Sequence, residues 1–409
     1  MTESDNKPLL GNIRVIELAV LVLGPSASVV MADFGAEVIK LEPLHTGDPN
    51  RQYHKLPGMP ASDMPYTFQV DNRNKKSIAI DLKSEAGYQA ACKLIADADV
   101  FVSNYRSQAL ARLKLDFETL QSINPRLIYA IGSGYGERGE ERHKPGYDNV
   151  CYWTRSAIET NVYPYEGWLG IFPFGAGDHP SGMSLYAAIM TALYQRTSTG
   201  KGCKVSTSML ANGAWANATM LQAQLCDASF KPKRPHARAY NFTSLHYRSR
   251  DGRLLKLGIV NTAKDWQPFC EAMSRTDFLT DERFASEENR LDNMEALIQE
   301  IDKSFASHDM SHWQDRFEHS DIPHGVVPTY EEAANDLQKQ ANDIVVPLNH
   351  PEYGQIRTVS SPFEVGGFEK ETPLAAPGLG EHTREILSSA GYSEDEIEQL
   401  ISDRVVQIQ

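Results

Sequence analysis

Two aspartates stand in glycine-containing turns close to aromatic residues. Asp148 ends the run Pro-Gly-Tyr-Asp and is followed by Tyr152 and Trp153, and Asp178 lies within Gly-Ala-Gly-Asp-His-Pro. Aspartates in such turns commonly accept hydrogen bonds from the backbone, which is a structural role. A carboxylate held beside aromatic rings can instead act as a nucleophile or a base. On the residues alone, both roles stay open for Asp148 and Asp178.

Basic and amide side chains gather in segments that should follow the strands of one sheet. They recur in a chain that is acidic overall, and Tyr105 among them could stack on a base. Open α/β folds bind ligands in the loops at the carboxyl ends of their strands. The pattern therefore predicts either a solvated rim or a pocket for an anionic ligand. These side chains are Lys40, Asn72, Arg73, Asn74, Lys75, Lys76, Asn104, Arg106 and Arg112.

Several other chemistries are disfavoured by the motifs that the chain lacks. Glu42 follows Gly24 by about the 20 residues typical of a dinucleotide-binding acid, but the turn has no GxGxxG, so we expect neither NAD nor flavin. His308 and His312 are four residues apart without the glutamate of a zinc-protease helix, and we expect no metal. There is no P-loop and no GxSxG. The five cysteines form no Cys-x-x-Cys pair, which is typical of reduced thiols, and we expect Cys151 to be packed rather than catalytic.

Alternating strand and helix patterns must position these side chains. Apolar runs at 13–18, 36–41, 77–81, 100–103, 127–131 and 204–206 predict strands, and helical patterns lie between most of them. Continuous apolar strands alternating with helices favour a parallel sheet covered on both faces. The predicted fold class is thus α/β, with a Rossmann-like parallel sheet. A helix is predicted over 181–197, so Asp178 is expected in the loop before it.

The residue composition of the sequence changes at two places further along the chain. Cations crowd between two prolines within 227–241, and a second connector is predicted at 321–328. Insertions at exposed linkers are well tolerated. We therefore predict a large domain from 1–226, a smaller inserted α+β domain from 227–325, and a return to the large domain from 326–409.

Composition excludes further classes of protein. The 409 residues are 41% hydrophobic and 23% charged, as in ordinary globular proteins. Lys and Arg number 40 against 54 Asp and Glu, a formal net charge of −14, so we expect no nucleic-acid partner. No apolar run approaches the roughly 20 residues of a membrane helix, and we expect no membrane partner. The polar, acidic start is unlike a signal peptide, and the expected location is cytoplasmic.

Taken together, several segments resemble the family III CoA-transferases, the group of formyl-CoA transferase and carnitine CoA-transferase. The resemblance covers nearly the whole chain. It rests on GPSASVVMADFGAEVIKLEP at 24–43, GDPNR at 47–51, NRNKKSIAIDLKSEAG at 72–87, the segment 99–139, PGYD at 145–148, GDHPSGM within 177–202, and the segment 376–397.

The resemblance implies an enzyme that moves CoA from an acyl-CoA thioester to a free carboxylic acid. In the family an aspartate attacks the thioester and forms a mixed anhydride, which CoA converts to an aspartyl-CoA thioester. Asp148 falls at the position of that aspartate, with Tyr147, Tyr152, Trp153 and Asp178 in the substrate pocket. Family members form an intertwined homodimer, so the same assembly is expected here.

By the same resemblance, two groups of residues would hold coenzyme A. The adenosine diphosphate would lie among Lys40, Asn72, Arg73, Asn74, Lys75, Asn104, Tyr105, Arg106 and Arg112. The pantetheine end would be lined by Ser133, Gly134, Tyr135, Gly136 and Glu137, with Val22 and Leu23 nearby.

The family also contains racemases of 2-methylacyl-CoA, which carry histidine before the aspartate. Tyr147 occupies that position here, and its phenol has the wrong pKa for proton transfer at neutral pH, so a transferase is favoured. Val22-Leu23 replaces a glutamine of formyl-CoA transferase, which disfavours the oxalate and formyl pair. The residues around Asp148 look more like the phenyllactate and 2-hydroxyisocaproate CoA-transferases. Apolar side chains, including Trp168 or Phe172, would suit an apolar or aromatic acyl group.

Overall fold

The computed structural model describes residues 8–167, 170, 172–258, 262–320 and 322–409, and the chain divides into two compact units. The larger unit takes in residues up to 162, 170–226 and 337–409, and the smaller unit 163–169 and 227–336. The main segment of the smaller unit thus runs from Asp227 to Asp336 rather than to 325, and a short earlier segment, 163–169, belongs to the same unit. Trp168 lies outside the described residues.

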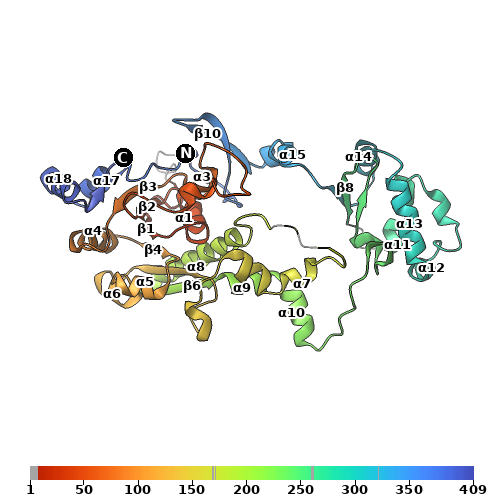
Figure 1. Ribbon diagram of the computed structural model, residues 1–409, viewed down its shortest axis with the longest axis horizontal. Helices are drawn as coiled ribbons and strands as arrows, with labels where there is room; N and C mark the ends of the chain where they lie inside the picture. The colour runs from red at the N-terminus through yellow and green to blue at the C-terminus, as the bar shows by residue number, and fades with distance from the viewer. Residues whose placement is uncertain (1–7, 168–169, 171, 259–261, 321) are drawn as a thin grey trace. The chain divides into compact units, whose positions relative to one another are not determined.

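The larger unit is built on a mostly parallel sheet, which confirms the predicted α/β class (Figure 1). Among the described residues it has seven strands in the order β12-β3-β2-β1-β4-β5-β6, and only β12 is antiparallel to its neighbour. The chain's last strand therefore returns to the edge of the sheet beside β3. The strands are β1 (Arg14–Leu18), β2 (Glu37–Glu42), β3 (Lys76–Ile80), β4 (Val100–Ser103), β5 (Ile128–Ser133), β6 (Lys204–Ser208) and β12 (Val406–Gln407).

Both faces of this sheet are buried under helices. Alternate strand residues face opposite ways, so that Val15 packs in one core and Ile16 in the other. Helices α1 (Leu23–Asp33) and α8 (Asp178–Thr199) cover the first face. Helices α4 (Glu85–Ala96), α5 (Ser107–Arg112), α6 (Phe117–Ile123), α17 (Thr383–Ser389) and α18 (Glu394–Ser402) cover the second. Burial on both sides explains the continuous apolar strands of the sequence.

The strand order changes direction at β1. The chain adds β2 and β3 on one side of β1 and then β4 and β5 on the other. A change of this kind leaves a crevice beyond the carboxyl ends of the central strands, since their following loops diverge to opposite sides.

Helix α8 begins three residues earlier than the sequence predicted, at Asp178 instead of 181. Pro180 lies in the first turn, where a missing N–H costs no helical hydrogen bond. Gly182 lets α8 approach α1 closely, because a Cβ there would lie 1.9 Å from Ser26 Oγ. This contact fixes the start of α8 against the start of α1, next to the carboxyl end of β1.

The smaller unit combines an antiparallel sheet with helices, as an α+β unit should. Its strands β7 (His246–Arg248), β8 (Leu254–Leu257) and β9 (His324–Val326) pair in that order. Aromatic rings fill the core, with Tyr247 and Phe305 stacked at 5.0 Å between centroids. Its helices are α11 (Thr262–Ala272), α12 (Glu287–Asp292), α13 (Met294–Phe305), α14 (Met310–Glu318) and α15 (Tyr330–Ala334).

The larger unit contains further short helices and strands. They are α2 (Asn50–Tyr53), α3 (Tyr66–Asn72), α7 (Ile158–Val162), α9 (Met209–Ala216), α10 (Ala218–Leu225), α16 (Leu337–Ala341), β10 (Val345–His350) and β11 (Gly354–Val359). Within the described ranges, none of the helices combines the length and apolar character needed to cross a membrane.

Candidate active site

A cavity of about 930 Å³ opens beyond the carboxyl ends of β1, β4 and β5, where the strand order changes direction. Its volume is near the upper end of the range of about 300–1,000 Å³ that is usual for cofactor and ligand sites. All of its lining residues belong to the larger unit, at positions 20–23, 104–109, 112, 131–134, 136–138, 142–147, 178, 204 and 209.

Many residues that the sequence singled out lie in this lining. They come from the loops after β1, β4 and β5, from the segment before Asp148, and from the start of α8. They are Val22, Leu23, Asn104, Tyr105, Arg106, Arg112, Ser133, Gly134, Gly136, Glu137, Tyr147 and Asp178. Tyr135, Asp148, Tyr152 and Trp153 are not among the lining residues.

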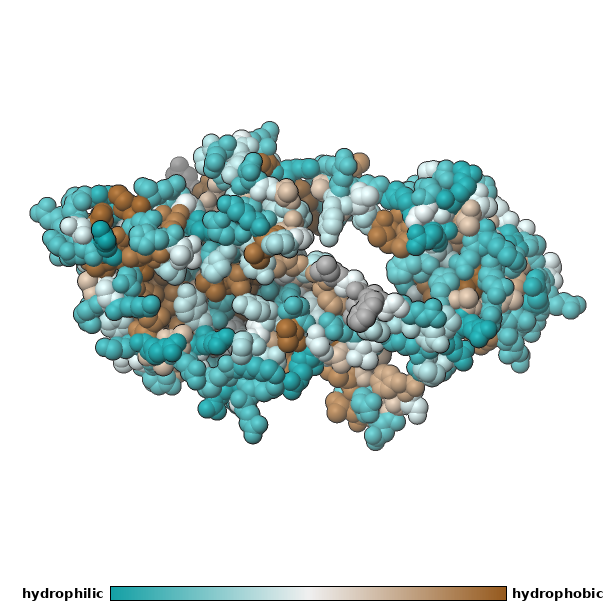
Figure 2. Space-filling model, in the orientation of Figure 1, coloured by the Kyte–Doolittle hydropathy of each residue, from teal (hydrophilic) through white to brown (hydrophobic). Residues whose placement is uncertain are grey.

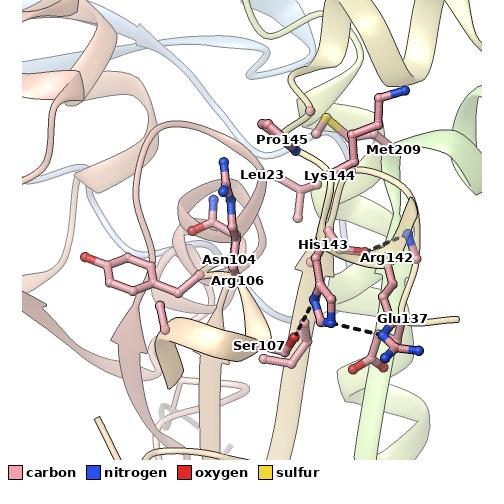
Figure 3. Close-up of a pocket in the computed structure, with 18 of the residues that line it drawn as sticks. Leu23, Asn104, Arg106, Ser107, Glu137, Arg142, His143, Lys144, Pro145 and Met209 are labelled. Carbon is pink, nitrogen blue, oxygen red and sulfur yellow. Dashed lines mark hydrogen bonds between the residues drawn. The ribbon is translucent and has the colours of Figure 1, made fainter. Parts of the chain in front are cut away.

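The wall of the cavity carries an excess of positive charge. Figure 3 shows Asn104 and Arg106 on one side and the segment from Arg142 to Pro145 on the other. His143 is held between Ser107 Oγ at 3.4 Å and Arg142 Nε at 3.0 Å. Among the charged lining residues the cations are Arg106, Arg112, Arg138, Arg142, Lys144 and Lys204, against Glu137 and Asp178. Since Glu137 is paired with Lys204, the surplus can meet a polyanion although the chain is acidic overall.

Five residues predicted to bind an anion lie elsewhere, beneath the loops. Lys40, Asn72, Arg73, Asn74 and Lys75 do not line the cavity. The guanidinium of Arg73 is buried against Asp33, with Nε 3.0 Å from Oδ1, and Asn74 Nδ2 donates to the same carboxylate at 3.1 Å. The sequence could not show that these cations are paired with buried anions from distant parts of the chain.

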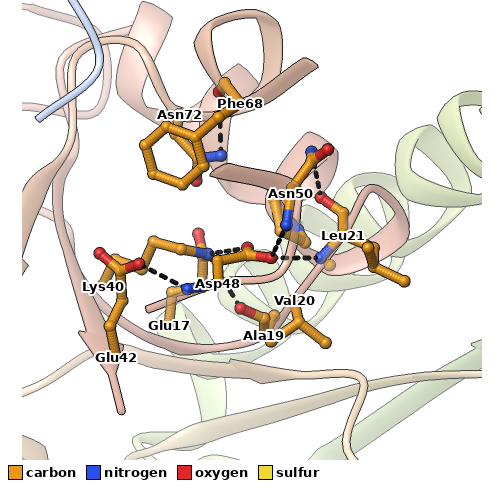
Figure 4. A network of polar contacts seen from close by, with 12 residues as sticks. Glu17, Ala19, Val20, Leu21, Lys40, Glu42, Asp48, Asn50, Phe68 and Asn72 are labelled. Atoms are coloured by element: carbon orange, nitrogen blue, oxygen red, sulfur yellow. Dashed lines mark hydrogen bonds and ion pairs between the residues drawn. The ribbon is translucent and has the colours of Figure 1, made fainter. Parts of the chain in front are cut away.

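Lys40 and Lys75 share one buried carboxylate, that of Glu17. Figure 4 shows Lys40 between Glu17 and Asp48. Lys40 Nζ lies 2.5 Å from Glu17 Oε1 and 2.9 Å from Asp48 Oδ2, and Lys75 Nζ lies 2.7 Å from Glu17 Oε2. All four side chains are fully buried or nearly so. Burial alone would raise the pKa of Glu17, but the two ammonium groups hold that pKa at about 2. Burial lowers the pKa of Lys75 to about 8, although Glu17 opposes the change.

This network fixes the loop that follows β1, which forms part of the cavity wall. Asp48 Oδ1 accepts from Leu21 N at 3.0 Å, and Lys40 Nζ donates to Ala19 O at 2.9 Å. From the other side, Asn104 both accepts from Val20 N at 2.9 Å and donates to Val20 O at 2.7 Å. These contacts hold Leu21 at a φ of 61°, a left-handed conformation unusual for leucine. The buried charges therefore support the site without lining it.

The two candidate aspartates are brought together by the turn before α8. Asp148 Oδ2 accepts a hydrogen bond of 3.0 Å from Gly177 N, and the next residue is Asp178. Burial raises the pKa of Asp148, and the hydrogen bond from Gly177 works against this change. Burial and then the charge of Asp148 raise the pKa of Asp178 to about 7. Two adjacent carboxylates of this kind titrate as a pair.

The segments that carry the two aspartates also carry aromatic rings. Asp148 precedes a π-helical segment, Asn149–Thr154, that buries Tyr152, and Gly177 has room beside that ring only because it lacks a Cβ. Trp153 stacks on Phe172 with centroids 4.1 Å apart, and Tyr53 on Phe174 at 4.4 Å. Burial, followed by Tyr147 and the two aspartates, raises the pKa of the Tyr53 phenol, which places it beside the carboxylates.

Several residues of the site were missed by the sequence reasoning. The run Arg142-His143-Lys144 immediately precedes PGYD and was a usable signal, since three basic residues stand together in an acidic chain. Tyr53, Phe174 and Lys204 carried no such signal. As predicted, Cys151 is a packed thiol, fully buried, and burial raises its pKa. Among the described residues, no three His, Cys, Asp or Glu side chains are grouped to hold a metal ion.

Residues 10–383 match the family described as CoA-transferase family III. This chain belongs to that family. The (R)-2-hydroxy-4-methylpentanoate CoA-transferase of Clostridioides difficile is 30% identical over 97% of this chain and 99% of its own length. The cinnamoyl-CoA:phenyllactate CoA-transferase of Clostridium sporogenes is 32% identical over 99% and 98%.

Solved structures agree on the fold. A CAIB/BAIF family protein from Brucella suis superposes with a TM-score of 0.81 at 24% identity, covering 93% of this chain and 99% of that chain. A Mycobacterium tuberculosis protein is 29% identical, with a TM-score of 0.77 and coverage of 93% and 99%. As a CoA-transferase of family III, the protein is an enzyme that acts on acyl-CoA and a carboxylate.

Proposed function

We propose that the cavity holds the CoA part of an acyl-CoA and that CoA passes to an acceptor acid through a covalent aspartyl intermediate. A carboxylate oxygen attacks the thioester carbonyl carbon, the C–S bond breaks, and CoA leaves as its thiolate. The thiolate then attacks the aspartyl carbonyl of the mixed anhydride, which releases the donor acid and leaves an aspartyl-CoA thioester. The acceptor carboxylate takes CoA by the same two steps in reverse.

The nucleophile that the geometry favours is Asp178, whereas the sequence motif favoured Asp148. Asp178 lines the cavity and Asp148 does not. Asp148 is engaged by Gly177 N–H, and its charge raises the pKa of Asp178 to about 7. A carboxylate with a raised pKa is a stronger nucleophile once ionised, and neutral pH still ionises a large fraction of it. The single observation that carries this proposal is the position of Asp178 in the wall of a cation-rich cavity.

The cations of the cavity wall would bind the phosphates of CoA. Arg106, Arg112 and Arg142 line the cavity, and the loop 133–137 would lie along the pantetheine arm. Arginine and lysine bind phosphate oxygens by charge-assisted hydrogen bonds. Lys40, Asn72, Arg73, Asn74 and Lys75 would support this site from below, because their polar groups are occupied by buried partners.

The acyl group would be apolar or aromatic and of medium size. Val22 and Leu23 line the cavity. Trp153, Phe172 and Phe174 lie in the segments that hold the two aspartates, with Trp153 stacked on Phe172 and Phe174 stacked on Tyr53 of α2. The relatives from Clostridioides difficile and Clostridium sporogenes are named for a branched and an aromatic hydroxy acid. A relative named for glutarate is equally similar, at 30% identity, so the choice rests on the apolar lining.

A homodimer would explain the exposed apolar side chains of the larger unit. Tyr194, Trp215 and Leu225 are 81%, 82% and 78% exposed on α8, α9 and α10. Figure 2 shows brown, hydrophobic atoms gathered over α10. Large apolar surfaces of this kind mark protein interfaces. Light scattering should give twice the chain mass of 45.6 kDa, and Leu225→Asp should shift the protein toward monomer. A monomer at micromolar concentration would contradict this assembly.

The experiment that tests the activity is an exchange assay. The protein is incubated with one acyl-CoA and a panel of free acids: cinnamate, short branched acids, carnitine and dicarboxylates. We expect new acyl-CoA esters of apolar or aromatic acids by mass spectrometry, and their loss in Asp178→Asn. A strict preference for dicarboxylates would contradict the acyl-group proposal. Exchange of the α-hydrogen for deuterium without any acceptor acid would identify a racemase instead.

A further inference from the structure

The residue after Asp178 makes two polar contacts that its neutral form cannot satisfy together. His179 Nδ1 lies 2.9 Å from Gly175 O, and His179 Nε2 lies 3.1 Å from Asp71 Oδ1. Both partners are acceptors. A neutral imidazole carries one N–H and would place a lone pair against the other oxygen, whereas the imidazolium donates to both. The geometry therefore selects the charged form of His179.

The burial of Asp71 favours the positive charge of His179. It lies on α3 and is 1% exposed, and its second oxygen, Oδ2, has no hydrogen-bond partner among the described residues. A buried carboxylate with only one hydrogen-bonding contact depends strongly on the opposite charge beside it. Burial lowers the pKa of His179, but Asp71 outweighs this effect and raises the pKa to about 9.

The imidazolium stands next to the carboxylate pair. Its charge acts on Asp178 on its own helix, on Asp148 before the π-helical segment and on Asp71 of α3, while both site carboxylates raise the pKa of Tyr53 on α2. The charge of His179 lowers the pKa of both Asp148 and Asp178, against burial and, for Asp178, against the charge of Asp148.

The same side chain also closes the turn that joins the two aspartates. Gly175 O accepts from His179 N and from His179 Nδ1, both at 2.9 Å, and Gly175 has a φ of 75°. This turn presents Gly177 N to Asp148. Loss of the imidazole would thus loosen the turn as well as remove a charge.

We propose that His179, held as an imidazolium by Asp71 and Gly175 O, is a positioning residue that keeps one of the two site carboxylates ionised at neutral pH. This inference rests on the proposed role of the Asp148–Asp178 pair in CoA transfer. In the resting enzyme the two carboxylates and the imidazolium then carry little net charge. Because the imidazolium lowers the pKa of Asp178, it also raises the fraction of Asp178 that is ionised and able to attack the thioester.

The first test does not depend on activity. Wild-type protein labelled with carbon-13 at the histidine Cε1 is titrated by NMR, and the His179 signal is identified by its loss in His179→Gln. We expect a His179 pKa above 8, falling toward the ordinary value of about 6.5 in Asp71→Asn. A wild-type pKa at or below 7 would overturn the inference, whatever the enzyme's activity.

The second test uses the pH dependence of kcat/KM. In His179→Gln the acidic limb should move to higher pH by about one unit, because the neighbouring positive charge is lost while Asp71 stays negative. Adding Asp71→Asn to that variant should return part of the shift, since Asp71 itself raises the pKa of Asp178. An equal loss of activity at every pH would show a merely structural role and contradict the proposal. Exposed His319, replaced by Gln, serves as the control and should leave the profile unchanged.

The two tests separate this inference from the proposed function. Absence of CoA exchange in the wild-type enzyme would overturn the proposed function, and the NMR titration would still report on the Asp71–His179 pair. A low His179 pKa in an active enzyme would overturn the inference alone.

Discussion

The carboxylate of Asp148 accepts a 3.0 Å hydrogen bond from the backbone N–H of Gly177, and so lies next to the first residue of α8. This contact joins two segments 29 residues apart. It brings Asp148 close enough to Asp178 for the charge of Asp148 to raise the pKa of Asp178. The helix N-terminus favours the ionised form of Asp178, but burial and Asp148 prevail.

Replacing Asp148 by Asn should shift the pH profile without abolishing turnover. Removal of its negative charge lowers the pKa of Asp178, so the acidic limb of kcat/KM should move from near 7 to lower pH by about one unit. Activity at pH 8 should stay within about tenfold of wild type, because the variant loses a charge beside the reacting groups but keeps the nucleophile Asp178. A variant as inactive as Asp178→Asn would assign the covalent step to Asp148 instead.

Asp178→Asn should stabilise the folded protein at high pH. The folded pKa of about 7 exceeds the unfolded value of 3.8, so between these values the native state binds more protons and wild-type stability falls as pH rises. The variant lacks this dependence. Urea unfolding should show its advantage over wild type growing by about 1–2 kcal/mol from pH 5 to pH 8, after allowance for solvent screening.

The matched control for that measurement is Asp97→Asn, which alters an exposed carboxylate beyond the end of α4. Its effect on stability should stay the same across the pH range. An advantage of Asp178→Asn that shrinks toward pH 8 would reverse the expected sign and contradict the raised pKa.

Arg106→Ala should weaken the binding of CoA esters. The exposed guanidinium lines the cavity, and loss of one charge-assisted contact to phosphate should raise KM for acyl-CoA about 10-fold with a smaller change in kcat. The KM of the variant should also respond less to added salt. Lys201→Ala removes an exposed cation outside the cavity and should change neither quantity. Equal effects from both variants would show only a loss of net charge.

Lys75→Met should destabilise the larger unit much more than Lys76→Met does. Lys75 is fully buried against Glu17, and removing it leaves a buried carboxylate short of one partner, at a cost of about 3–5 kcal/mol. The side chain of the neighbouring Lys76 is 35% exposed in its ion pairs with Glu37 and Glu385, and its loss should cost about 1 kcal/mol or less. Thermal and urea unfolding measure the loss of stability in each variant. Equal losses would show that the buried network contributes no more to stability than a surface ion pair.

The sheet could be predicted from the sequence because its signal is local. Strands such as β1 and β4 are short apolar runs buried on both faces, and Ser84 caps α4 by accepting from Gly87 N, three residues along the chain. Residues following β1, β4 and β5 line one cavity, since parallel strands end at the same edge.

What could not be predicted depends on contacts between distant segments. Lys40 and Lys75 resemble ligand-binding cations in sequence, and only Glu17, 23 and 58 residues away, shows that they are internal ion pairs. The early start of α8 accompanies the contact of His179 with Asp71, 108 residues away. The sequence therefore could not indicate which of the two aspartates lines the cavity.

The most direct test of the covalent step is to trap the intermediate. The enzyme is mixed with an acyl-CoA, quenched with hydroxylamine, digested and mapped by mass spectrometry, with Asp178→Asn as the control. We predict a hydroxamate on Asp178 that needs acyl-CoA and is absent from the control. A hydroxamate confined to Asp148, or one that persists in Asp178→Asn, would contradict the assignment of the nucleophile.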